Sequence, residues 1–145
     1  MSTKEVQEAL VANMKRWQEI EDASVSSTGK IIDQTENPVI KTVMEIIQRD
    51  SQMHHRVQGM IADSLEKQAI SLTPEELATV WESIESHIAL EQETIKLARE
   101  ALKILEGKQM VVQEYLLNYL LADESKHNAI LATLDKIKAG MYPYG

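Results

Sequence analysis

The chain has 145 residues, a length that predicts a single domain. With 43% hydrophobic and 26% charged residues, it has the composition of a soluble globular protein and not of a disordered one. The net charge of −8 argues against nucleic-acid binding, because phosphate recognition needs concentrated Lys and Arg. The absence of cysteine excludes disulfides, zinc–thiolate sites, iron–sulfur centres and a cysteine nucleophile. Any metal ion must therefore be held by oxygen and imidazole ligands.

Membrane and secreted proteins are also not expected. No run of apolar residues approaches the roughly 18 that a membrane-spanning helix requires. Residues 1–10 lack the apolar core of a signal peptide, so we expect a cytoplasmic protein.

Helix start and stop signals divide the chain into four segments. Pro38 and Pro74 each follow a good N-cap residue, Asn37 and Thr73. Gly107 follows an apolar run of helical period and favours a helix end. The alternation of apolar and polar residues that is typical of strands is missing. We predict helices over residues 3–34, 38–68, 74–105 and 109–138, followed by a short C-terminal tail.

Four helices of this length favour one architecture. Each would be about 45 Å long, and short connections between such rods favour antiparallel packing. We therefore predict an all-α fold, an antiparallel up-down-up-down four-helix bundle that forms one domain over residues 1–145. Residues 24–29 are poor helix material. They leave two interpretations, a continuous first helix, which we favour, or a loop that shortens it.

Ionisable side chains interrupt each apolar stripe, and their spacing predicts that they face the core. In an antiparallel hairpin, residues at one height have numbers that add to a constant. With turns centred near residues 35–36, 70–71 and 107, these groups fall in one layer near mid-bundle. Glu21 and Asp50 then lie at one height, and so do Glu91 and Asp123. The groups in the layer are Glu21, Asp50, His54, His87, Glu91, Asp123, Glu124 and His127.

A dry layer of carboxylates and imidazoles is a ligand set for two divalent first-row metal ions. Buried ionisable groups cost several kcal/mol unless they are paired or bind a cation, and carboxylates can neutralise and bridge two ions. Between Asp123 and Glu124, we favour Glu124 as the ligand because of its spacing to His127, with Asp123 as an acceptor that orients an imidazole. His87 and Glu21 also have ordinary interpretations, a hydrogen-bonded histidine and a surface acid.

These residues resemble the ferritin-like di-metal carboxylate bundles, the group that includes rubrerythrins, ferritins and bacterioferritins. Its pattern is a Glu on the first and third helices and Glu-x-x-His on the second and fourth. Glu124-Ser-Lys-His127 matches the fourth-helix motif, and Glu21 and Glu91 fall where the single glutamates would lie. The resemblance implies two metal ions, with iron expected first and manganese or zinc as alternatives. It also implies oxygen- or peroxide-linked redox chemistry fed by an external electron donor.

The second helix departs from the family pattern. Asp50-Ser-Gln-Met53 has Met where the pattern has His, and His54 follows one residue later. His87 is an additional candidate that the pattern lacks, and the second connection is short where ferritin has a long crossover. Whether the protein is an enzyme is therefore left open.

Repeated sequence features indicate a duplicated hairpin. Trp17-Gln-Glu-Ile-Glu parallels Trp81-Glu-Ser-Ile-Glu, and the spacing of Asp50 and His54 parallels that of Asp123 and His127. Self-association is a further expectation, with Trp81 and residues 141–144 as the candidate interface.

Two other functions remain open. A non-catalytic acidic helical interaction module would pair its buried acids and imidazoles with one another and bind no metal. A hydrolytic site with two metal ions or a single zinc would activate water instead.

Overall fold

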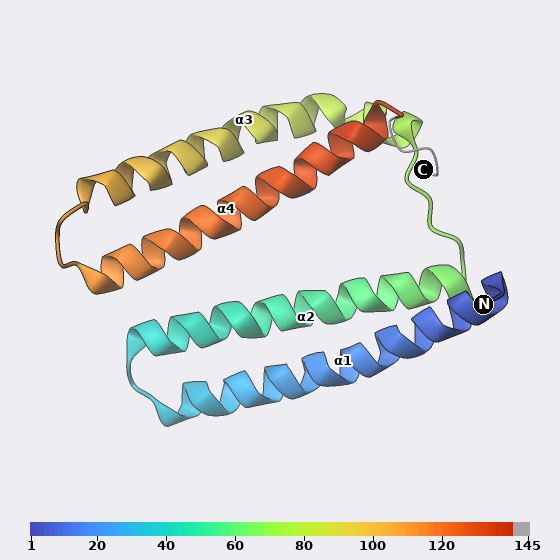
Figure 1. Ribbon diagram of the computed structural model, residues 1–145, viewed down its shortest axis with the longest axis horizontal. Coiled ribbons are helices and arrows are strands. Elements are labelled where there is room, and N and C mark those ends of the chain that lie inside the picture. Colours follow the sequence, from blue (N-terminus) through green and yellow to red (C-terminus); the bar gives the residue numbers. More distant parts are fainter. Residues whose placement is uncertain (141–145) are drawn as a thin grey trace. The chain divides into compact units, whose positions relative to one another are not determined.

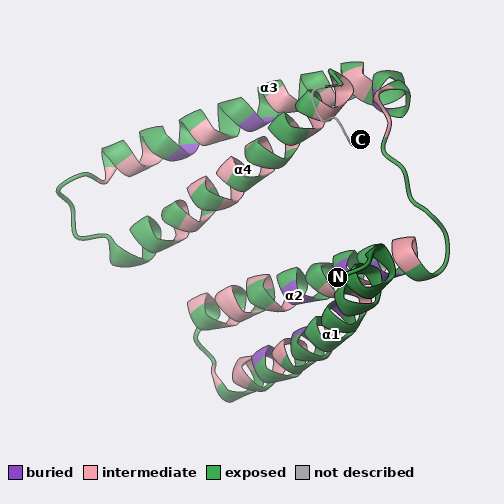
Figure 2. Cartoon of the chain, turned by 45° about the vertical axis from the view of Figure 1, so that its right-hand side comes forward, coloured by how far each residue is buried: buried purple, intermediate pink, exposed green. Residues whose placement is uncertain are grey.

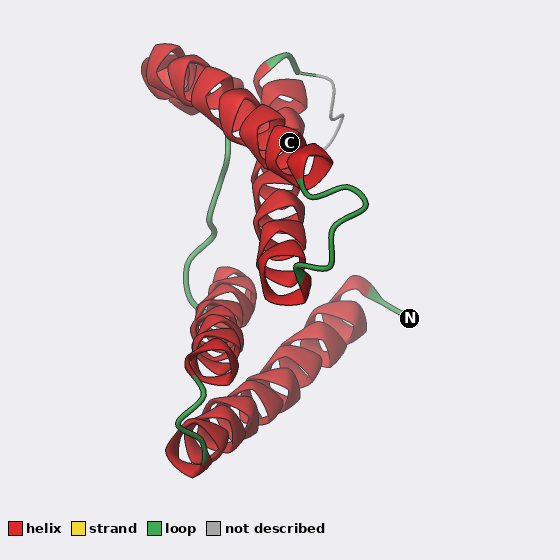
Figure 3. Cartoon of the chain, turned by 90° about the vertical axis from the view of Figure 1, so that its left-hand side faces the viewer, coloured by secondary structure: helices red, strands yellow, loops and turns green. Residues whose placement is uncertain are grey.

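A computed structural model describes residues 1–140, and all regular secondary structure in this part of the chain is helical (Figure 3). The helices are α1 (Thr3–Gln34), α2 (Pro38–Glu66), α3 (Pro74–Ile104) and α4 (Val111–Lys138). The predicted all-α class is confirmed, and every predicted helix boundary lies within two residues of the observed one.

The predicted start signals act as helix caps. Asn37 accepts hydrogen bonds at Oδ1 from the backbone N–H groups of Val39 and Ile40, directly before Pro38. Thr73 and Glu76 form a reciprocal capping box in which each side chain bonds the other's backbone N–H. Both contacts satisfy N–H groups that a helix start leaves without partners. The sequence therefore fixes where α2 and α3 begin.

Residues 24–29 are helical, so the continuous first helix is confirmed. The hydroxyl of Thr28 is buried and donates to the backbone oxygens of Ser24 and Val25 in its own helix. Ser24 Oγ lies 2.8 Å from Ser51 Oγ on α2. Small hydroxyl side chains thus face α2 here, and their polar groups are satisfied locally, which offsets their weak helix propensity.

The helices form two compact units, one over Met1–Ile70 and one beginning at Ser71. In the first, α1 and α2 form an antiparallel hairpin, and in the second α3 and α4 do the same (Figure 1). The prediction of one four-helix bundle stays a prediction at this level.

Each hairpin buries little apolar surface of its own. Buried residues lie as single spots along the helices (Figure 2). The buried apolar side chains are Met14, Ala62, Leu77 and Ala98. Many larger ones stay exposed, such as Ile20 at 63%, Leu90 at 64% and Ile130 at 56%. A pair of helices with so small a core needs further cover for its apolar face.

Within residues 1–140, no helix combines the length and the apolar character needed to cross a membrane. The predicted tail continues beyond the described residues. Residues 141–144, which we expect to contribute to self-association, lie outside the part that the structure describes.

Candidate metal centre

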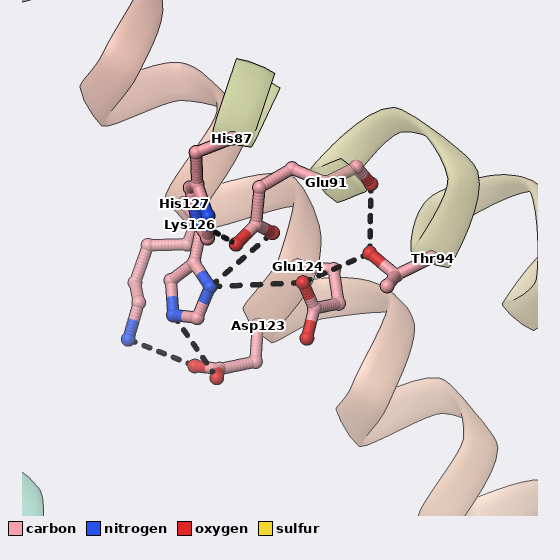
Figure 4. Close-up of polar contacts among 7 residues, drawn as sticks. All are labelled: His87, Glu91, Thr94, Asp123, Glu124, Lys126 and His127. Atoms are coloured by element: carbon pink, nitrogen blue, oxygen red, sulfur yellow. Dashed lines mark hydrogen bonds and ion pairs between the residues drawn. The ribbon is translucent and has the colours of Figure 1, made fainter. Parts of the chain in front are cut away.

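Three of the predicted ligands meet between α3 and α4. Glu91 on α3 and Glu124 and His127 on α4 each place one ligand atom within 4.8 Å of the others (Figure 4). Glu124 and His127 are three residues apart on one helix, so one face of α4 presents both side chains. The fourth-helix motif therefore faces the single glutamate of α3.

Glu91 is the most buried member of this cluster. Only 7% of the residue is exposed, and its two carboxylate oxygens have different surroundings. Oε1 lies 2.8 Å from His87 Nε2, one turn earlier on α3. Oε2 is buried, has no hydrogen-bond partner, and faces His127 Nδ1 at 3.5 Å. A buried carboxylate oxygen without a hydrogen bond is costly unless a cation neutralises it.

His127 is oriented from both sides of its ring. Nδ1 faces Glu91 at 3.5 Å and Glu124 Oε2 at 3.7 Å. Nε2 lies 3.3 Å from Asp123 Oδ2, and Lys126 pairs with the other Asp123 oxygen at 2.8 Å. Nδ1 therefore faces the two glutamates, and Nε2 faces Asp123. Asp123 thus lies on the opposite side of the imidazole from Glu124, a position from which a carboxylate can orient the ring.

Thr94 belongs to the site, although the sequence analysis does not single it out. Its hydroxyl lies 2.7 Å from the backbone oxygen of Glu91 and 3.0 Å from Glu124 Oε2. Thr94 comes three residues after Glu91, a spacing that places both on one face of α3 and that could have identified it. The hydroxyl holds one oxygen of Glu124 in position.

The surroundings of Glu91 favour its charged form. The side-chain interaction with the neighbouring Glu124 carboxyl group has the largest effect and lowers the pKa of Glu91. Burial opposes this by raising the pKa, while the hydrogen bond with His87 and the positive charges of His127 and His87 lower it further. The net result is a pKa below the ordinary glutamate value of 4.5.

A pH dependence of stability follows for the metal-free protein. A carboxylate whose pKa is lowered on folding stabilises the fold above its unfolded pKa, and that contribution disappears as pH falls through the folded pKa. The free energy of unfolding of wild type relative to Glu91→Gln should thus be constant above about pH 5 and fall below pH 4.5. Urea unfolding of both proteins with chelator across this range measures it. A difference that grows on acidification would contradict the expectation.

The α1–α2 hairpin holds a second acid–imidazole pair. Glu21 is 8% exposed, and its Oε2 atom is buried, lacks a hydrogen-bond partner and lies 3.5 Å from His54 Nδ1. Trp17 donates its indole N–H to Glu21 Oε1 at 3.1 Å. Glu21 is therefore a buried group facing α2 and not the surface acid of the alternative interpretation.

In each hairpin, the buried glutamate faces a residue other than the one that we expect at its height. Glu21 faces His54 and not Asp50, and Glu91 faces His127 and not Asp123. In both hairpins the observed partner lies four residues later. Asp50 is exposed and has no ion pair or hydrogen bond with the rest of residues 1–140.

His87 lies at the margin of the α3–α4 cluster. Its side chain is 57% exposed, and its contact is the hydrogen bond to Glu91. This matches the interpretation as a hydrogen-bonded histidine. Of the predicted ligands on α3 and α4, His87 and Asp123 hold other members in place, while Glu91, Glu124 and His127 converge.

Comparisons with known proteins do not assign the chain to a family. No protein-family model matches it, and neither a curated protein nor a solved structure matches it. The resemblance to ferritin-like bundles therefore stays a prediction, and the candidate centre stands on its own geometry.

Proposed function

We propose that this protein binds a divalent first-row metal ion through Glu91, Glu124 and His127. The observation that carries the proposal is Glu91 Oε2, a buried carboxylate oxygen with no hydrogen-bond partner that faces an imidazole nitrogen. Two carboxylates and one imidazole are suitable ligands for iron, manganese or zinc. The Asp123 contact that orients His127 is of the kind that accompanies metal-bound histidines.

The separations between the ligand atoms fit an ion better than direct hydrogen bonds. His127 Nδ1 lies 3.5 Å and 3.7 Å from the nearest oxygens of Glu91 and Glu124, beyond the usual range of about 2.7–3.2 Å for N–H···O bonds. Two ligands that are each about 2.1 Å from one ion at a tetrahedral angle are separated by about 3.4 Å. The two separations from His127 Nδ1 therefore match the spacing that an ion would require.

We extend the proposal to the finer predictions from the sequence. The two hairpins would close into one ferritin-like four-helix bundle, and Glu21 and His54 would help hold a second ion. Iron is the first expectation, and it would supply oxygen- or peroxide-linked redox chemistry with electrons from an external donor. The support is the presence of a buried, unpartnered glutamate oxygen beside an imidazole in each hairpin.

Metal content of purified protein tests the proposal. Protein from cells supplied with iron, manganese or zinc should contain bound metal by elemental analysis, whereas Glu124→Ala and His127→Ala should contain much less metal in the α3–α4 centre. Glu93→Gln is a matched control, because Glu93 is an exposed acid on α3 and should leave the metal content unchanged.

Full metal stoichiometry in the Glu124→Ala and His127→Ala variants would refute the assignment of these ligands. A complete lack of metal in wild type, with a melting temperature that chelator does not change, would favour the interaction module instead. In that case the buried acids and imidazoles would only pair with one another.

A further inference from the structure

The two hairpins carry the same arrangement around a buried glutamate. His54 Nδ1 lies 3.5 Å from Glu21 Oε2, and His127 Nδ1 lies 3.5 Å from Glu91 Oε2. Both glutamates are more than nine-tenths buried, and the Oε2 atom of each has no hydrogen-bond partner. The same atoms thus meet at the same separation in both hairpins.

The equivalence extends to the preceding helical turn. Trp17 lies four residues before Glu21 and donates to its Oε1 atom at 3.1 Å. His87 lies four residues before Glu91 and contacts its Oε1 atom at 2.8 Å. In each hairpin, a ring nitrogen therefore holds one carboxylate oxygen and leaves the other directed at the histidine.

The two arrangements differ at the third ligand. Thr94 Oγ1 donates to Glu124 Oε2 at 3.0 Å, whereas Ser24 Oγ lies 2.8 Å from Ser51 Oγ. Ser51 precedes His54 by three residues, as Glu124 precedes His127. Ser51 is 5% exposed and faces α1. It therefore has the place of Glu124, with a neutral hydroxyl instead of a carboxylate.

We infer that the α1–α2 hairpin is a second, weaker metal site with Glu21 and His54 as ligands, which the chain fills only after the α3–α4 centre. The inference rests on the proposed function and adds an order of loading. Affinity for a divalent cation depends on the number and charge of its ligands, and this hairpin supplies one carboxylate fewer. Replacing the serine should restore that carboxylate.

Equilibrium dialysis of the whole chain against Co²⁺, followed by elemental analysis, tests the order. Wild type should bind two ions with dissociation constants that differ by at least about tenfold. Glu21→Gln should remove the weaker ion and keep the tighter one, and Glu91→Gln should do the reverse. Ser51→Glu should bring the two dissociation constants closer together, because the added carboxylate tightens binding at the weaker site. Ser27→Glu, which adds the same charge at an exposed position of α1, should not.

A carboxylate at the buried position 51 can also prevent folding, so Glu124→Ser provides the reverse test. It should raise the dissociation constant of the α3–α4 centre toward that of the α1–α2 site. The order of loading is wrong, although metal binding stands, if Glu21→Gln weakens binding of the tighter ion as much as Glu91→Gln does. It is also wrong if neither Ser51→Glu nor Glu124→Ser brings the two dissociation constants closer together. If wild type binds no Co²⁺, the proposed function and this inference both fail.

Discussion

Addition of a divalent first-row metal ion is expected to raise the melting temperature of this protein, and Glu91→Gln should lose most of that increase. The reason is that Glu91 brings a buried oxygen without a hydrogen bond, next to a second carboxyl group, into the centre of the cluster. An ion that binds only the folded chain stabilises it by about 2.7 kcal/mol at a hundred times its dissociation constant. For a chain of this size, that corresponds to roughly 5–10 °C. Thermal unfolding of both proteins, with metal and with chelator, measures the effect.

The matched control for this experiment is Glu93→Gln, on the exposed side of the same helix. It should respond to metal as wild type does. The result that contradicts the expectation is an equal increase in wild type and Glu91→Gln, since Glu91 would then not contribute to the ion's binding.

The helices could be predicted because their signals are local. The caps at Asn37 and Thr73 act through contacts within three residues, and the structure forms them as predicted. Residues 24–29 could not be decided from propensity, because their stability depends on where their hydroxyls bond. Thr28 bonds to its own helix and Ser24 to Ser51 on α2. The second of these contacts depends on the partner helix and is not visible in the local sequence.

Three predicted ligands on α3 and α4 converge in the structure, but the partner of each buried glutamate across its hairpin could not be predicted. Side chains on a helix lean toward its N-terminus, so two that meet across an antiparallel pair each lie about one residue further along the chain than their Cα heights indicate. The turns are also centred about half a residue later than the assumed midpoints, since they lie between Gln34 and Pro38 and between Ile104 and Val111. Together these effects account for about three of the four residues that separate His54 from Asp50 as the partner of Glu21.

This shift also changes the interpretation of the second-helix motif. With Asp50 at the position of the family glutamate, Met53 falls at the histidine position. Because His54 contacts Glu21, His54 takes the histidine position of the motif, one residue after Met53. The glutamate position then falls on Ser51, which faces α1. A serine has no charge that a search for acids could detect. Its position becomes informative only through the matching geometry around His127.

The apolar faces of the hairpins give the second large expected effect. Successive helical residues are 100° apart, so Leu116, Ile130 and Leu134 share one face of α4, while Ala129 lies on another. Ile130 is 56% exposed in the described structure, although its face also borders the acid–imidazole cluster. If the hairpins close into a four-helix bundle, this face becomes core. Ile130→Lys should then lower the free energy of unfolding by at least about 2 kcal/mol, because it buries a charge and removes apolar contacts.

Ala129→Lys is the matched control, since it adds the same charge one residue away on an exposed face and should change the free energy of unfolding by less than about 0.5 kcal/mol. Denaturant unfolding of the three proteins at several chain concentrations distinguishes the ways in which the face can be covered. A bundle within one chain predicts a cost for Ile130→Lys that does not depend on concentration, whereas cover by a second copy predicts a midpoint that rises with concentration. If Ile130→Lys lowers the free energy of unfolding as little as the control does, this face of α4 stays exposed to solvent and the prediction of a four-helix bundle is wrong.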